Sequence, residues 1–180
     1  MPTIFSHAIF AGVAGKAILK KPVSLWFWAL TALCATIPDA DVFGLAFGIG
    51  FGDMFGHRGF THSIMFALIF GGIIAFFADR FLQTGISLIK LFVFFSLATF
   101  SHPLLDMLTN GGSGAAIFAP FSNERYFFPW RPVEVSPIGI RFFSGRGLSV
   151  ILSEIIWIWL PAIAVLITAM IIRKLRKASR

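Results

Sequence analysis

The sequence predicts an all-α protein: a polytopic integral membrane helical bundle of about five helices, with a re-entrant or interfacial segment and an ordered outer loop. Hydrophobic residues make up 57% of the 180 residues and charged residues only 13%, about half the charged fraction of a soluble domain. The mean hydropathy is +0.86. These values exclude a water-soluble globule and a disordered or collagen-like chain. The single cysteine excludes a disulfide scaffold.

Five apolar segments approach the length of about 20 residues that spans a bilayer as a helix. The first contains His7 and Lys16, the second lies between Pro22 and Pro38, and we expect Pro161 to kink the fifth. The segments cover residues 3–19, 23–37, 60–78, 86–108 and 148–172. No basic residue precedes the first of them, so we expect no cleaved signal peptide.

Two connecting segments are long. Residues 42–56 are apolar but contain five glycines, a poor composition for a helix, which predicts a re-entrant or interfacial segment. Residues 109–147 mix Gly, Pro, Asn and aromatic residues with Arg and Glu, which predicts an ordered extramembrane loop. No linker divides the chain, so we expect residues 1–180 to form one membrane-embedded domain.

Alternating spans divide the basic residues unequally between the two sides of the membrane. Ten lie on the side of the C-terminus and five on the other. The larger set is Lys16, Lys20, Lys21, Arg80, Lys90, Arg173, Lys174, Arg176, Lys177 and Arg180, and the smaller set is Arg58, Arg125, Arg131, Arg141 and Arg146. Because cytoplasmic helix ends carry the basic excess, we expect the C-terminus inside and a short N-terminus outside. Anionic lipid explains the basic residues, so we expect membrane lipids as partners and no nucleic acid.

The same alternation gathers the histidines and three aspartates at the non-cytoplasmic end of the bundle. They are His7, Asp39, Asp41, His57, His62, His102 and Asp106. Imidazole and carboxylate groups are ligands of Zn, Mn and Fe, and ionisable groups at membrane depth are costly and usually functional. We therefore predict a divalent metal centre, with a purely structural polar cluster as the alternative.

Residue spacing adds detail to this prediction. His102 and Asp106 are four residues apart and share a face if their helix continues that far. Asp39 and Asp41 are expected in a loop, where one can bind the metal while the other orients a ligand imidazole. His57, a weaker candidate than His62, and Arg58 are candidate contacts of metal or substrate.

Glu154 lies about two turns into the last predicted helix from the same end. A carboxylate at this depth should face the bundle interior. It is either a further metal ligand or general base, or it pairs with an arginine such as Arg146.

Taken in order, the polar motifs resemble the YdjM family of bacterial inner-membrane proteins, which are described as metal-dependent hydrolases. The motifs are His7, Pro38-Asp39-Ala40-Asp41, residues 57–63 (HRGFTHS) and His102-Pro103-Leu104-Leu105-Asp106, which together cover roughly residues 1–110. The family is similar at a distance to helical zinc-dependent phospholipase C and S1/P1-type nucleases. The resemblance implies that the metal ligands are His7, Asp39, His62, His102 and Asp106. Those soluble enzymes use further histidines for three zinc ions, and none follows His102 here, so we expect one or two Zn ions, with Mn or Fe as alternatives.

These observations predict a metal-dependent hydrolase in the bacterial inner membrane, with its site facing the periplasm. A phosphoesterase acting on a lipid or lipid-linked phosphate through a metal-activated water fits best, because the site opens at headgroup depth. Asp39, Asp41 or Glu154 would be the catalytic base. The alternatives are a metal or ion transporter and a structural or regulatory membrane subunit that binds metal for stability.

Overall fold

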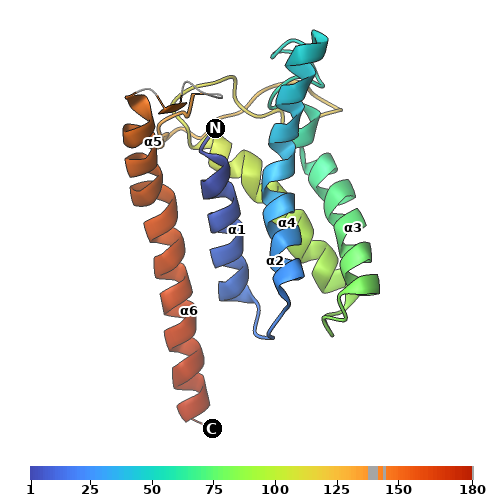
Figure 1. The fold of residues 1–180 in the computed structure, drawn as a ribbon, viewed down its shortest axis with the longest axis vertical. Helices are drawn as coiled ribbons and strands as arrows, with labels where there is room; N and C mark the ends of the chain where they lie inside the picture. Colours follow the sequence, from blue (N-terminus) through green and yellow to red (C-terminus); the bar gives the residue numbers. More distant parts are fainter. Residues whose placement is uncertain (138–141, 144, 180) are drawn as a thin grey trace.

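The helices run alternately up and down one bundle, with the two termini at opposite ends (Figure 1). The computed structural model describes residues 1–137, 142–143 and 145–179. The elements are α1 (Ile4–Ile18), α2 (Leu25–Thr36), η1 (Ile37–Phe47), η2 (Phe60–His62), α3 (Ile64–Phe81), α4 (Leu88–Met107), α5 (Arg146–Glu154), η4 (Ile155–Trp159) and α6 (Leu160–Ala178). No strand occurs among the described residues, so the all-α prediction is confirmed.

Four helical stretches in the described part of the chain are long and apolar enough to cross a membrane. They are Leu25–Phe47, Ile64–Phe81, Leu88–Met107 and Arg146–Ala178. The first of the five expected spans corresponds to α1, which has only 15 residues, or about 22 Å of helix against a hydrocarbon core of about 30 Å. It packs between α6 and α2 (Figure 1).

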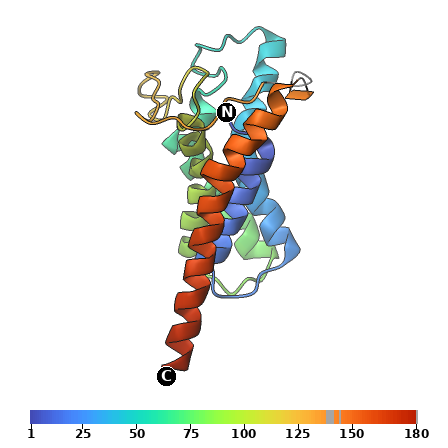
Figure 2. The same cartoon turned by 90° about the vertical axis from the view of Figure 1, so that its left-hand side faces the viewer.

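The last helix, α6, extends past the other helices at the C-terminal end (Figure 2). Where it passes the end of α1, the Arg173 guanidinium donates to the carbonyl oxygens of Lys16, Ala17 and Leu19. These carbonyls lie in and just after the last turn of α1 and have no partner within that helix. Arg173 therefore caps the C-terminus of α1 with a positive charge, which the helix dipole favours.

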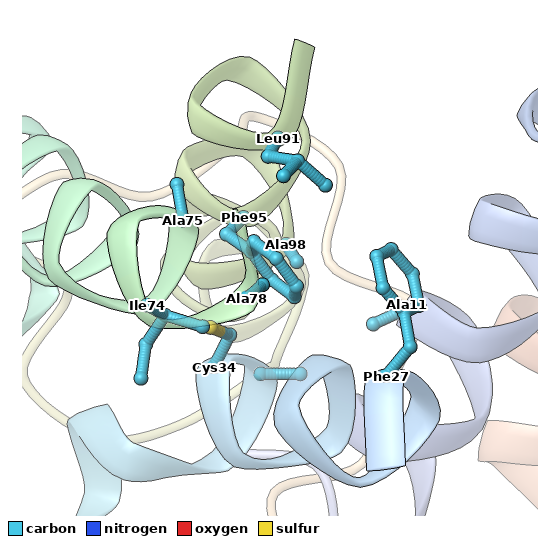
Figure 3. Close-up of a cluster of buried hydrophobic side chains, with 10 residues drawn as sticks. Ala11, Phe27, Cys34, Ile74, Ala75, Ala78, Leu91, Phe95 and Ala98 are labelled. Carbon is cyan, nitrogen blue, oxygen red and sulfur yellow. The ribbon is translucent and has the colours of Figure 1, made fainter. Parts of the chain in front are cut away.

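The hydrophobic core lies where α2, α3 and α4 meet (Figure 3). The ring centroids of Phe27 and Phe95 are 5.1 Å apart, and Cys34 and several alanines fill the space beside them. The single cysteine is thus fully buried in the core. α3 packs closely against α4 at Gly71, where a Cβ atom would stand 2.5 Å from the backbone nitrogen of Ser96. Small residues allow membrane helices to pack at such short distances.

The helix that begins with α2 does not end at Pro38 as we expected. It continues into the 3₁₀ helix η1, which carries Asp39 and Asp41. Pro38 is tolerated because it falls in the first turn of η1, where its missing N–H leaves no helical hydrogen bond unmade. The expectation of a loop at the two aspartates was therefore wrong. Gly48, with a φ of 81°, ends η1.

Residues 42–56 form the end of η1 and a series of turns. η1 rises above the ends of the neighbouring helices (Figure 1). Phe43, Phe47 and Phe55 are 74%, 84% and 64% exposed. Exposed phenylalanine side chains at the end of a membrane bundle fit the interfacial alternative rather than the re-entrant one.

The final predicted helix is continuous from α5 through α6. The π-helical turn η4 ends two residues before Pro161, which lacks the N–H that an α-helical ladder would use there. We expected a kink at Pro161, and the structure has this wider turn just before it.

The outer loop folds back on the end of α4. Asn110 donates its backbone N–H to the carbonyl oxygen of Val133 at 2.9 Å, and Ala115 and Tyr126 exchange two backbone hydrogen bonds of 3.0 Å. Part of the expected loop, residues 138–141 and 144, lies outside the described residues. The described part of the loop covers the end of the bundle that holds the predicted site.

Candidate metal centre

The five predicted ligands meet at this end of the bundle. His7 comes from α1, Asp39 from η1, His62 from η2, and His102 and Asp106 from the last turns of α4. The three histidines and Asp106 are completely buried, and the Asp39 side chain is 10% exposed. α4 remains helical through its internal proline, so His102 and Asp106 share a face as their spacing predicts.

Four of these residues direct one ligand atom each toward a common point. Nε2 of His102 lies 3.2 Å from Oδ1 of Asp39 and 3.9 Å from Oδ2 of Asp106. Nε2 of His62 lies 3.8 Å and 3.4 Å from the same two oxygens. All four residues offer ligand atoms within 4.8 Å of one another. Ligands at about 2.1 Å from a tetrahedral zinc ion are separated by about 3.4 Å, so these atoms are spaced as ligands of one ion.

The facing atoms have no hydrogen-bond partners. The buried atoms that make no hydrogen bond include both oxygens of Asp39, both oxygens of Asp106, and the Nε2 atoms of His62 and His102. Buried polar groups normally have a partner. Arg58 compensates part of the carboxylate charge at Asp106, and a further cation would compensate the rest. A divalent ion would bind the four facing atoms, one from each of Asp39, His62, His102 and Asp106. A set of two imidazoles and two carboxylates suits Zn, Mn or Fe.

Contacts outside the cluster orient both imidazoles. Nδ1 of His102 donates to the Ala35 carbonyl oxygen at 2.8 Å. Nδ1 of His62 lies 3.2 Å from Oδ2 of Asp41. In each ring the anchored Nδ1 leaves Nε2 to face the cluster, which is the usual arrangement around metal-binding histidines.

Asp41 is engaged as a hydrogen-bond acceptor. It accepts from Nδ1 of His57 at 2.7 Å, from the Thr61 hydroxyl at 2.6 Å and from the Arg58 backbone N–H at 3.1 Å. The distance between Asp41 and His57 is that of a hydrogen bond and is too short for two ligands of one zinc ion. Asp41 and His57 therefore form a hydrogen-bonded support for His62, which is one of the two roles foreseen for the aspartate pair.

His7 closes the cluster from the side of α1. Its ring stacks on His102, with centroids 3.7 Å apart and planes inclined by 15°. Its Nε2 lies 3.5 Å from Oδ1 of Asp106, and neither ring nitrogen has a hydrogen-bond partner. Asp106 thus turns one oxygen toward His7 and the other toward His62 and His102.

Arg58 contacts a ligand carboxylate. It is only 1% exposed, and its Nε lies 2.9 Å from Oδ2 of Asp106. Its guanidinium also donates to the Thr109 hydroxyl and the Gly111 carbonyl, each at 3.3 Å. Its φ of 64° lies in the left-handed region, which is unfavourable for a bulky residue. The sequence carries no signal of this conformation or of the buried ion pair.

The surrounding charges control the protonation of His62. Burial lowers the pKa of this ring, but the Asp106 and Asp41 carboxylates outweigh burial and raise the pKa to about 9. A ring with this pKa carries a proton at neutral pH. A divalent ion bound to Nε2 would take the place of that proton.

Glu154 lies apart from the cluster. Its carboxylate accepts hydrogen bonds from the Thr3 backbone N–H, the Thr3 hydroxyl and the Ser6 hydroxyl, and it is completely buried. These bonds engage both carboxylate oxygens, and among the described residues no ion pair joins Glu154 to Arg146. Glu154 therefore caps the N-terminus of α1, the helix that carries His7.

A cavity of about 300 Å³ lies beside the centre on its loop side. Its lining includes Phe51, His57, Arg58 and Ser113. The Arg125 guanidinium donates to the Ser113 hydroxyl at 3.0 Å and to the His57 carbonyl oxygen at 2.9 Å. Two guanidinium groups therefore stand at this cavity, one in its wall and one just behind it.

Comparison with known proteins agrees with the motif resemblance and extends it to nearly the whole chain. A model of the YdjM inner membrane protein family matches residues 1–178. The chain is similar to the inner membrane protein YbcI of Escherichia coli (strain K12), with 38% identity over 162 residues, which is 89% of this chain and 92% of that protein. No solved structure matches. Similarity to phospholipase C is not shown, and neither name states an activity.

Proposed function

The chain belongs to the YdjM inner membrane protein family, and we propose that it is a membrane-bound metal-dependent hydrolase, a phosphoesterase acting on a lipid or lipid-linked phosphate. The observation that carries this proposal is the set of buried imidazole and carboxylate atoms that face one another without hydrogen-bond partners. Buried titratable groups arranged in this way are typical of functional sites.

We assign one divalent ion, zinc or alternatively Mn or Fe, to Asp39, His62, His102 and Asp106, with His7 beside it. When bound, such an ion supplies a Lewis acid that activates water and stabilises charge on a phosphoryl oxygen. One ion is favoured over two because the neighbouring donors around Asp41 are already hydrogen-bonded to one another.

Among the three carboxylates predicted as the base, the contacts favour Asp39. Hydrogen-bond donors engage Asp41 and Glu154, whereas neither oxygen of Asp39 accepts a hydrogen bond. A carboxylate with a free lone pair can accept a proton from an attacking water molecule. Oδ1 of Asp39 faces His62 and His102, so we assign proton acceptance to Oδ2.

The position and charge of the site support an anionic lipid substrate. Arg58 lines the 300 Å³ cavity and Arg125 contacts its wall at Ser113; guanidinium groups bind phosphate oxygens well. The ligands lie at the ends of the spanning helices, where lipid headgroups lie. A transporter is disfavoured because its binding site would lie near the bilayer midplane.

The test combines metal analysis with hydrolysis. Elemental mass spectrometry of detergent-purified protein should find about one equivalent of Zn, Mn or Fe per chain. His102→Ala and Asp106→Asn should lose the metal and at least about 100-fold in the rate of hydrolysis of phosphatidic acid, phosphatidylglycerol or a polyprenyl diphosphate. Asp79→Asn, at an exposed position at the far end of α3, is the matched control and should keep both properties.

Two outcomes would contradict the proposal in different ways. A folded wild-type protein that stays metal-free after incubation with each ion would leave the cluster as a structural polar network. A metal-loaded protein that cleaves none of these phosphoesters would refute the phosphoesterase. If its ligand variants then lost melting temperature alone, the metal would be structural.

A further inference from the structure

A large apolar groove lies between α1 and α4, away from the metal centre's loop side. Its volume is about 780 Å³, within the range of cavities that bind organic ligands. Ala14 of α1 and Phe94 and Leu97 of α4 are among its lining residues. Ile89 and Leu97 are 65% and 58% exposed, so the groove is open sideways to the surrounding membrane. We call it the lateral groove.

The lateral groove is long enough for an acyl chain. On α4 its lining begins at Ile89 and ends at Ser101, which corresponds to about 18 Å of helix. One leaflet of the hydrocarbon core is about 15 Å deep. The apolar lining therefore covers the full depth of one leaflet, and it ends one residue before the ligand His102.

The opposite end of the groove is cationic. Lys20 and Lys21 follow α1, and Lys90 lies in the first turn of α4; all three line the groove and are exposed. Lys21 donates to the Gly85 carbonyl oxygen at 2.7 Å, and in the described part of the chain none of the three forms a salt bridge with a carboxylate. Their charge is therefore available to an anion at the groove mouth.

The N-terminus of α4 adds to this charge. Ser87 is its N-cap and lines the groove, but its side chain makes no capping hydrogen bond. The first N–H groups of a helix are unsatisfied and carry a partial positive charge, which favours phosphate. A phosphate at the mouth would meet three ammonium groups and this helix end together.

We propose that the lateral groove is a binding site for an anionic phospholipid of the leaflet at the lysine end, with the phosphate at Lys20, Lys21 and Lys90 and an acyl chain along α4. The occupant follows from the combination of a cationic mouth with an apolar groove of leaflet depth that opens into the membrane. Basic pockets between membrane helices recognise anionic headgroups in this way. The proposal does not rest on the hydrolase activity.

Native mass spectrometry of the full chain in neutral detergent tests the site, with phosphatidylglycerol and phosphatidylcholine as probes. The wild type should retain phosphatidylglycerol in preference to phosphatidylcholine. Each lysine near an anionic headgroup contributes about fivefold in affinity, so the triple variant K20Q/K21Q/K90Q should bind phosphatidylglycerol about 100-fold more weakly. The control K16Q/K174Q/K177Q removes the same charge outside the groove lining and should bind as the wild type does.

A second pair of variants tests the groove without changing the charge. Ala14→Phe places a ring in the groove and should abolish retention of phosphatidylglycerol, whereas Ala29→Phe, at an exposed position of α2 outside the lining, should not. Melting temperature and elution volume establish that each variant is folded. Equal loss in the two lysine variants would mean that net charge alone attracts the lipid, and equal retention of both lipids by the wild type would exclude an anionic site. Either result overturns the proposal.

Discussion

Glu154→Gln separates a positioning carboxylate from a catalytic one. The buried carboxylate accepts three hydrogen bonds at the N-terminus of α1. Glutamine keeps one acceptor, replaces the other oxygen by a donor and removes the charge. The lost charge-assisted bond and the lost interaction with the helix dipole should together cost about 2–3 kcal/mol. For a chain of this size that corresponds to a fall in melting temperature of about 4–12 °C.

Thermal unfolding in detergent measures this shift, and elemental mass spectrometry on the same sample measures the metal. We expect Glu154→Gln to melt lower but to retain metal while folded, because none of the facing ligand atoms belongs to Glu154. Glu134→Gln in the outer loop is the matched control and should change neither quantity. If Glu154→Gln lost metal or phosphoesterase activity with an unchanged melting temperature, the carboxylate would act directly in the site and our assignment would be wrong.

Four further outcomes follow from the structure. Asp41→Asn removes the charge that orients His62, so zinc affinity should fall about 10- to 100-fold in a competition titration; an unchanged affinity would refute the positioning role. Gly71→Ala places a Cβ atom against the α4 backbone and should lower the free energy of unfolding by about 1–3 kcal/mol. The control Gly72→Ala meets only an aromatic side chain at 3.5 Å and should change the free energy of unfolding little. Similar losses in the two variants would contradict the close approach of α3 to α4. Removal of metal by a chelator should lower the melting temperature by about 5–10 °C, and no shift would argue against a bound ion. A reporter fused to the C-terminus should register as cytoplasmic, and an external signal would reverse the predicted topology.

The composition of the candidate site could be predicted because helix alternation is a strong constraint. Once the apolar segments are recognised, the order of the helices brings His7, His62 and His102 to one end without any knowledge of side-chain contacts. The spacing of His102 and Asp106 adds a shared face because α4 stays helical through its proline. The structure brings these residues together as the sequence predicts.

Other features depend on contacts that local sequence does not encode. Pro38 and the glycines after it favour a helix end, yet η1 continues because proline is compatible with a first turn. The partners of Glu154 are 148 and 151 residues away in the sequence, so periodicity indicates that it faces inward but not what it binds. The ion pair of Arg58 with Asp106 likewise requires the three-dimensional arrangement.

The two caps of α1 have a consequence for biosynthesis. α1 is held at its N-terminus by Glu154 and at its C-terminus by Arg173. Both residues belong to the stretch Arg146–Ala178, which is synthesised after the helices that carry the other ligands. α1 is also the helix that falls short of a full span. α1 therefore reaches its final position, with His7 against His102, only after the stretch Arg146–Ala178 has entered the membrane. A chain truncated before residue 146 would hold the other ligands but not the completed centre, so the site is assembled only once residues 146–178 have packed against α1.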